Sequence, residues 1–187
     1  DPLQINSLLN EMIESGCEYC FMEVSSHSLN QKRVEGLNFS GAVFTNLTND
    51  HLDYHNTFSE YRDVKKSFFD YLDKNAFALI NKDDKNGKKM LEGTKANKLT
   101  YALKSMADYS CKLVEGHFDG MHLKINNLDV WVKLIGEFNA YNLLAVYAVA
   151  KQFDFEDSEI LTALSVLKSA EGRFQFVKNQ NSITGIV

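Results

Sequence analysis

The chain has 187 residues, of which 44% are hydrophobic and 24% are charged, a composition typical of a soluble globular domain with a core of its own. Its formal charge of −5 argues against nucleic acid as a partner, because nucleic-acid-binding domains carry a basic surface. No apolar run reaches the length of a membrane span, and three cysteines are too few for a closed disulfide framework, so we expect a cytoplasmic protein without a membrane partner.

The N-terminal region is predicted to form a helix followed by a strand. Residues 4–15 carry apolar side chains at helical spacing and precede Gly16, a common helix stop. Residues 19–24 have the composition of a buried strand. Cys17 and Cys20 form a C-x-x-C motif, but the sequence has no second cysteine pair to complete a zinc site. We therefore expect both cysteines to be small residues of the core, and a zinc or redox role is the alternative.

A second predicted strand, residues 41–45, runs into a polar cluster that holds Asn46, Asn49, Asp50, His51, Asp53 and His55. The first strand also ends in polar residues, which include Glu23, Ser25 and His27. Ligands of open α/β sheets bind at the carboxyl ends of strands. Carboxylates and imidazoles from two such ends suit a divalent metal. A hydrogen-bonded polar loop is the alternative for the second cluster.

The helix after this cluster contains a lysine in an unusual place. Thr57 and Glu60 form a capping box, and apolar residues then recur at helical spacing at positions 61, 64, 68 and 72. Lys65 falls on this apolar stripe, whereas Lys66 does not. Three interpretations stay open for Lys65. Its methylene groups could be buried while its amine reaches water, it could form a structural ion pair, or it could be a functional lysine whose pKa is lowered by its surroundings.

The remaining elements predict the fold class. A strand at 77–80 and a helix near 84–92 continue the alternation that is typical of a doubly wound, mostly parallel α/β sheet. From residue 98 to 135, apolar residues recur at every second position instead of at helical spacing, and Asp119-Gly120 and Asn126-Asn127 are turn signals. This pattern predicts an appended antiparallel β-sheet. Helices are then predicted from Asn139, as the N-cap, to Ala148 and at 157–169.

Three weaker patterns concern ligands. Ser25, Gln31 and Arg33 could together donate hydrogen bonds to a phosphate or carboxylate group. The alternative is that they belong to a solvated loop without a ligand. Asn139 and Asn142 are most simply a helix cap and a surface residue, and contact with a nucleotide is the alternative. The pair Gly172-Arg173 is a weak signal by itself. A Gly-rich phosphate loop is missing, and the chain begins without Met and stops in a β-like run, so we expect a piece of a longer protein.

Taken together, these strings resemble the central domain of the Mur ligases. The resemblance rests on Glu23-Val24-Ser25-Ser26-His27, Gln31-Lys32-Arg33-Val34 and the run from Phe44 to His55, which are specific. It continues in order through 61–65, 136–142 and Gly172-Arg173, so it covers nearly the whole chain. Within the family the strings are most similar to those of the MurE type, the UDP-N-acetylmuramoyl-tripeptide synthetases.

The resemblance implies a P-loop-NTPase-like central domain of a monomeric, ATP-dependent ligase of peptidoglycan precursor synthesis. Such an enzyme adds an amino acid to UDP-MurNAc-dipeptide through an acyl phosphate. By position, Glu23 and His51 match ligands of Mg²⁺, and Lys65 matches a lysine that CO₂ converts to a carbamate, which would support the metal site. The resemblance also matches Ser25, Gln31 and Arg33 to the UDP-substrate side, and Asn139, Asn142 and Arg173 to the nucleotide side.

Two parts of the family pattern are not in this sequence. The resemblance places the phosphate loop before residue 1 and a C-terminal, amino-acid-binding domain after residue 187, so we expect this piece alone to fold but not to catalyse ligation. The identity of the added amino acid, lysine, diaminopimelate or another, is left open. The alternatives are a non-catalytic binding module of the same fold and a related ligase of the MurF or folylpolyglutamate type.

Overall fold

The computed structural model describes residues 1–48, 57–169, 176–178 and 184–186. The chain divides into two compact units. Unit 1 comprises Asp1–Ala42, Leu47–Ala78 and Lys88–Asn97, and unit 2 comprises Val43–Asn46, Leu79–Gly87 and Lys98–Val187.

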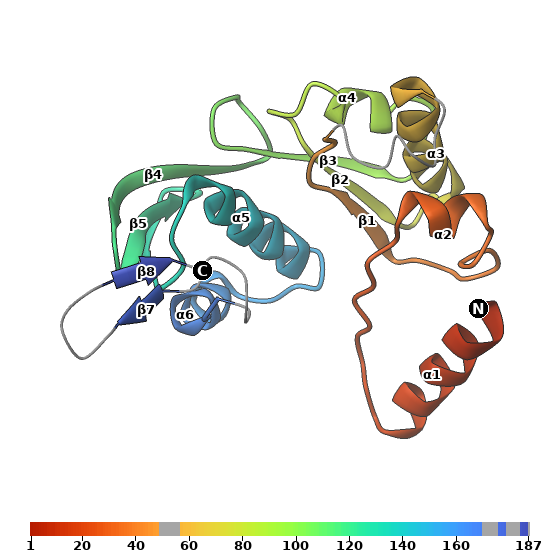
Figure 1. Cartoon of the computed structure of the whole chain (residues 1–187), viewed down its shortest axis with the longest axis horizontal. Coiled ribbons are helices and arrows are strands. Elements are labelled where there is room, and N and C mark those ends of the chain that lie inside the picture. Colours follow the sequence, from red (N-terminus) through yellow and green to blue (C-terminus); the bar gives the residue numbers. More distant parts are fainter. Residues whose placement is uncertain (49–56, 170–175, 179–183, 187) are drawn as a thin grey trace. The chain divides into compact units, whose positions relative to one another are not determined.

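The chain begins with two helices, then alternates between strands and helices, and continues with consecutive strands and a pair of helices before a final pair of strands (Figure 1). The helices are α1 (Pro2–Glu14), α2 (Ser26–Asn30), α3 (Phe58–Tyr71), α4 (Gly87–Met90), α5 (Glu137–Lys151) and α6 (Asp157–Val166). The strands are β1 (Gly41–Phe44), β2 (Phe77–Asn81), β3 (Asn97–Ala102), β4 (Tyr109–His117), β5 (Gly120–Ile125), β6 (Leu128–Val132), β7 (Phe176–Lys178) and β8 (Thr184–Ile186). One sheet has the order β1-β2-β3-β4-β5-β6, and β7 pairs antiparallel with β8. The predicted α/β class, with a parallel and an antiparallel part, is confirmed.

In unit 1, α3 is the helix that carries Lys65. It begins as predicted, because the Thr57 side chain accepts a hydrogen bond from the Glu60 backbone N–H at 3.1 Å. Its buried face holds Tyr61 and Phe69, and α2 packs against it. Near its end, the buried hydroxyl of Thr94 donates to the Phe69 carbonyl. The capping signal therefore predicted the start of this helix correctly, whereas the apolar spacing identified Tyr61 but not Phe69, which is buried while the predicted Phe68 is half-buried.

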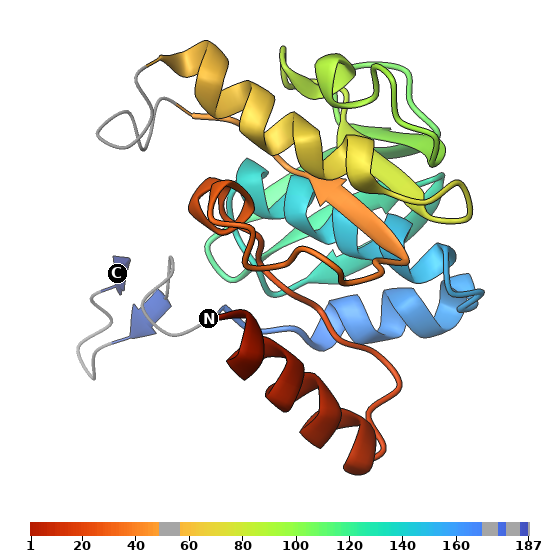
Figure 2. The ribbon, with the colours of Figure 1, turned by 90° about the vertical axis from the view of Figure 1, so that its right-hand side faces the viewer.

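The region before α2 differs from its prediction. Helix α1 forms as expected but begins two residues earlier than predicted, with Asp1 as its N-cap, and none of its residues is buried. Residues 19–24 form no strand, and the chain runs without helix or strand from α1 to α2 (Figures 1 and 2). Cys17 and Cys20 are both exposed, so their prediction as core residues is wrong. Apolar content makes a strand possible, but the strand forms only where a neighbouring strand pairs with its backbone groups.

In unit 2, strands β4, β5 and β6 form the predicted antiparallel meander. The β5–β6 turn has positive φ angles at Asn126 (44°) and Asn127 (69°), the conformation that suits a two-residue hairpin. The antiparallel part is nevertheless narrower than 98–135, because β3 pairs with β4 in parallel. A period of two is the same for parallel and antiparallel strands, so it could not predict this direction. Just before β4, the Asp108 carboxylate accepts from both the N–H and the hydroxyl of Thr100 in β3.

The core of unit 2 lies between this sheet and helices α5 and α6. Helix α5 packs against β4 and α6, and its buried residues include Leu143, Leu144 and Tyr147. The helix begins earlier than predicted, because Gly136 (φ 89°) is its N-cap. Asn139 is therefore not the N-cap but lies within the first turn, where its amide donates to the Ile135 carbonyl at 2.8 Å. A glycine readily adopts the positive φ angle found at this helix start.

Candidate functional site

Lys65 lies on α3 with its amine only partly accessible to water. Its Nζ atom is 5.5 Å from the centre of the Tyr61 ring, one helical turn earlier, within the range of a cation–π contact. Burial lowers the pKa of Lys65 below its ordinary value, and the Glu23 carboxylate opposes part of that change. Lys65 is thus a partly buried lysine with an acidic neighbour that acts on its charge, and its functional role stays a prediction.

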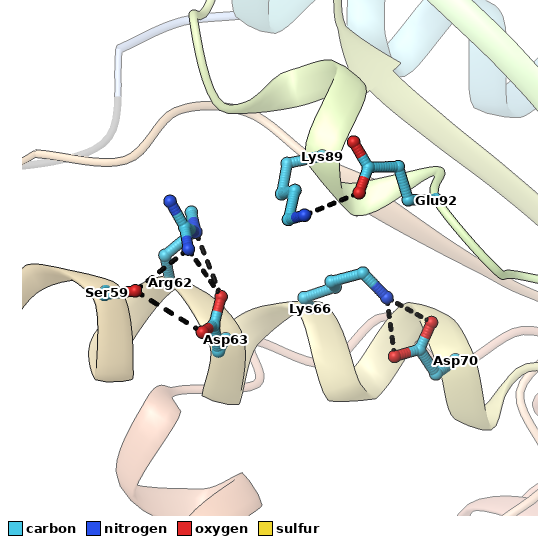
Figure 3. A network of polar contacts seen from close by, with 7 residues as sticks. All are labelled: Ser59, Arg62, Asp63, Lys66, Asp70, Lys89 and Glu92. Atoms are coloured by element: carbon cyan, nitrogen blue, oxygen red, sulfur yellow. Dashed lines mark hydrogen bonds and ion pairs between the residues drawn. The ribbon is translucent and has the colours of Figure 1, made fainter.

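Three other basic residues on α3 and α4, Arg62, Lys66 and Lys89, are in a different situation (Figure 3). Lys66 contacts the Asp70 carboxylate at 2.6 Å, four residues along α3, and Lys89 contacts Glu92 at the same distance. Arg62 donates to Asp63 and to the Ser59 hydroxyl. Such surface pairs contribute little to stability. In the described part of the chain, Arg62, Lys66 and Lys89 each have a carboxylate within hydrogen-bonding distance, whereas Lys65 lies over the Tyr61 ring.

Glu23 and Lys65 are the two predicted metal-site residues that the structure describes, and both belong to unit 1. Glu23 is exposed and lies in the segment before α2, not at the end of a strand as predicted. In the described part of the chain, no three His, Cys, Asp or Glu side chains form a metal-binding group. The predicted ligand His51 and its neighbours Asp50, Asp53 and His55 lie outside the described residues.

The predicted substrate residues Ser25, Gln31 and Arg33 flank α2. Ser25 is the N-cap of this helix, and its Oγ accepts from the Ser28 N–H at 3.1 Å. At the other end, the Gln31 Oε1 atom accepts from Arg33 Nε at 2.9 Å and from a second guanidinium nitrogen at 2.5 Å. The structure therefore brings Gln31 and Arg33 together in an exposed pair and gives Ser25 a capping role.

In unit 2, polar side chains gather where β1, β2 and β3 end. The buried Asn81 amide donates to the Thr45 carbonyl at 2.9 Å, and the Asn81 Oδ1 atom accepts from the Asp83 N–H at 3.0 Å. Asp83 in turn accepts from backbone N–H groups that follow β3. The predicted strand at 77–80 stops just before these residues, and no role was predicted for them. The signal that could have identified them was Asn81-Lys82-Asp83-Asp84 directly after an apolar strand.

The predicted nucleotide residues Asn139 and Asn142 lie together on the first turns of α5. The Asn142 amide approaches the Asn139 Oδ1 atom at 3.4 Å, while the Asn139 amide is bonded to the Ile135 carbonyl. Asn142 is exposed, so its amide is accessible to a ligand. The third predicted nucleotide residue, Arg173, lies outside the described residues. No helix in the described part of the chain is long and apolar enough to span a membrane.

Comparisons with known proteins agree on one family. Residues 1–150 match the model of the Mur ligase middle domain. A UDP-N-acetylmuramoyl-L-alanyl-D-glutamate–2,6-diaminopimelate ligase from Parabacteroides distasonis is 52% identical over 187 residues, which are 100% of this chain and 38% of the relative. A protein of the same name from Cytophaga hutchinsonii is 47% identical, again over 100% of this chain and 38% of the relative. The chain thus spans well under half the length of these relatives.

Solved structures show the same likeness in three dimensions. The structure of a UDP-N-acetylmuramoyl-L-alanyl-D-glutamate–2,6-diaminopimelate ligase superposes with a TM-score of 0.86 and 29% identity, covering 95% of this chain and 38% of that one. A MurF structure from Acinetobacter baumannii gives a TM-score of 0.71 at 17% identity, over 79% of this chain and 33% of that one, and so shares the fold.

Proposed function

Because the chain belongs to the Mur ligase family, whose middle domain it matches over residues 1–150, we propose that it forms the central, ATP-binding domain of a peptidoglycan-precursor ligase. The proposed substrates are ATP, a UDP-N-acetylmuramoyl-dipeptide and an amino acid. The names of the relatives at 47% to 52% identity support 2,6-diaminopimelate as that amino acid. ATP and UDP-linked precursors are cytoplasmic compounds, so the proposal includes a cytoplasmic location.

The proposed reaction forms an amide at the expense of ATP. A carboxylate oxygen of the dipeptide attacks the γ-phosphorus, ADP leaves, and an acyl phosphate results. The amine of the amino acid then attacks the acyl carbon, phosphate leaves, and the amine loses a proton. Both steps depend on holding the reacting groups together and on balancing the charge of the phosphates.

The observation that carries this proposal is the environment of Lys65. Its partial burial lowers the pKa, which raises the fraction of neutral amine at a given pH. A neutral amine can attack CO₂: the nitrogen–carbon bond forms, a proton is released to water, and an anionic carbamate replaces the cation. We propose that Lys65 carries this carbamate in the working enzyme, as the family resemblance implies.

The residues present fit a role in holding Mg²⁺. Glu23, the acidic neighbour whose charge acts on Lys65, supplies a carboxylate, and a carbamate on Lys65 would supply further oxygens, the ligand type that Mg²⁺ prefers. Mg²⁺ would neutralise charge on the transferring phosphate. We keep His51 as a further proposed ligand. On the same grounds, we propose Ser25, Gln31 and Arg33 for the UDP-substrate side, and Asn139, Asn142 and Arg173 for the nucleotide side.

The activity is tested on the complete protein that contains this chain. Phosphate release is measured with ATP, Mg²⁺ and UDP-N-acetylmuramoyl-L-alanyl-D-glutamate, with 2,6-diaminopimelate, with lysine, or without an amino acid. We expect release to require an amino acid and to be fastest with diaminopimelate. Release that is independent of the amino acid, or no release at all, would contradict a ligase and favour a binding module. A preference for lysine would contradict only the amino-acid assignment.

The role of Lys65 is tested with its neighbour as the matched control. We expect Lys65→Arg to abolish ligation, because a guanidinium forms no carbamate, and Lys66→Arg to retain it, because that residue pairs with Asp70 on the surface. With ¹³C-bicarbonate at alkaline pH, a carbamate carbon signal should appear in the wild type and in Lys66→Arg but not in Lys65→Arg. A wild type without that signal would refute the carbamate.

A further inference from the structure

Asp83 joins three segments of unit 2 through a single carboxylate oxygen. Its Oδ2 atom accepts from the N–H of Leu103 at 2.8 Å, from the N–H of Lys104 at 2.9 Å and from the Tyr141 hydroxyl at 2.9 Å. Asp83 itself directly follows β2, Leu103 and Lys104 directly follow β3, and Tyr141 lies on α5. The side chain therefore connects two strand ends to the beginning of a helix.

The charge of Asp83 suits this role. Burial acts to raise the pKa of Asp83, but hydrogen bonds from Ser105, from two backbone N–H groups and from Tyr141 outweigh it and hold the pKa below its usual value. The carboxylate is therefore ionised at neutral pH, and hydrogen bonds to a charged acceptor are stronger than those between neutral groups. Its second oxygen, Oδ1, is buried and has no hydrogen-bond partner among the described residues.

A second contact links the same two segments. The Lys104 Nζ atom lies 2.7 Å from the Glu137 carboxylate, so the segment after β3 is connected to the first residue of α5 as well as to Tyr141. Both side chains of this ion pair are largely exposed, so we expect it to contribute less than the Asp83 contacts.

The helix turn held in this way carries the proposed nucleotide residues. Tyr141 stands between Asn139 and Asn142 in the sequence, and all three lie in the first two turns of α5. We propose that Asp83, acting through Tyr141, is a positioning residue that holds Asn139 and Asn142 where they bind the nucleotide. This inference rests on the proposed function, because it takes those asparagines as nucleotide contacts.

Helix α5 offers a matched control for the Tyr141 hydroxyl. Tyr147 lies on the same helix, and its hydroxyl donates to the Asp157 carboxylate at 2.7 Å, so it makes the same kind of bond at the other end of the helix. Tyr141→Phe and Tyr147→Phe each remove one such bond and keep the ring. A purely structural role would make the two variants alike in ligand binding.

The test uses the complete protein and ATP with Mg²⁺, measured by titration calorimetry. We expect Tyr141→Phe to weaken ATP binding about fivefold to tenfold, less than the loss of a direct hydrogen bond to a charged group because the lost bond acts on ATP only through the position of the helix, and Asp83→Asn to weaken it further. Tyr147→Phe should stay within about twofold of the wild type. In steady-state assays, KM for ATP should rise in Tyr141→Phe, while KM for the UDP-linked substrate stays unchanged.

Hydrogen exchange gives a readout of the positioning itself. Amides of Leu103, Lys104 and residues 137–142 should exchange faster in Tyr141→Phe than in Tyr147→Phe. ATP affinities of Tyr141→Phe and Asp83→Asn within twofold of the wild type would overturn the inference and leave the proposed function standing. A wild type that does not bind ATP would overturn the proposed function, and the inference with it.

Discussion

Replacing Asn81 by alanine tests how the ends of β1 and β2 are held together. The Asn81 side chain is 8% exposed, and it makes one hydrogen bond to the Thr45 carbonyl and one to the Asp83 N–H. The first connects two strand ends that are 36 residues apart in the sequence. The second orients the backbone of Asp83, the residue whose side chain reaches the segment after β3 and helix α5.

The expected cost follows from these two bonds. Each intramolecular hydrogen bond contributes about 1 kcal/mol net, and a buried group left without its partner adds its desolvation penalty. Asn81→Ala leaves a carbonyl and an N–H group without their side-chain partner, so we expect a loss of about 2–3 kcal/mol in the free energy of unfolding. For a chain of this size such a loss lowers Tm by about 4–12 °C.

Urea unfolding followed by tryptophan fluorescence measures this loss. The sequence has one tryptophan, Trp131 in β6, which belongs to unit 2 together with Asn81. Asn86→Ala is the matched control, because Asn86 is also buried, at 7% exposed, but among the described residues its amide bonds only within its own turn, to Asp84 at 3.2 Å. We expect a cost of about 1 kcal/mol or less for the control. Equal costs in the two variants would refute the reasoning.

Three further predictions concern single contacts. Thr57→Ala should destabilise α3 by about 1 kcal/mol through loss of its N-cap, and Thr57→Ser should not; thermal unfolding by circular dichroism that fails to separate them would count against the cap. The hydrogen bond from the Tyr147 hydroxyl lowers the pKa of Asp157 in the folded protein. The ionised carboxylate therefore stabilises the fold fully above its ordinary pKa of about 4, and this contribution is lost as the pH falls through the lowered pKa of the folded protein. The Tm difference between the wild type and Asp157→Asn should therefore be constant above about pH 5 and shrink in acid; a difference independent of pH would contradict it. Asn127→Val should cost about 1–2 kcal/mol because of the positive φ angle, whereas Asn127→Gly should be tolerated, and equal Tm values would exclude strain at this turn.

Local signals in the sequence were sufficient where a residue and its immediate neighbours determine the structure. The Thr57 cap, the turn at Asn126-Asn127 and the partial burial of Lys65 were all predicted, because each depends on spacing within a few residues. The family was also evident from the sequence, since its strings occur in order along the chain. These strings identify which residues to consider, but they contain no distances.

Pairing between distant segments was decided only in three dimensions. Residues 19–24 were predicted to be a strand from their apolar content, but a strand requires a partner that its own sequence does not specify. The parallel direction of β3 relative to β4 could not be predicted either, because a two-residue periodicity is the same for parallel and antiparallel strands. Likewise, Gly136 became the N-cap of α5 because its backbone adopts a positive φ angle, although Asn139 has the stronger capping side chain.

The same distinction holds for the candidate site. The sequence by itself determined that Lys65 lies on an inward helix face and that Glu23 belongs to a family string. Only the tertiary structure showed that the Glu23 carboxylate acts electrostatically on Lys65 and that Asp83 connects the ends of β2 and β3 to α5. The physical reason is that the pKa of a lysine and the hydrogen bonds of a carboxylate depend on groups within a few ångströms. The Asp83 oxygen and the Tyr141 hydroxyl, which meet at 2.9 Å, are 58 residues apart in the chain.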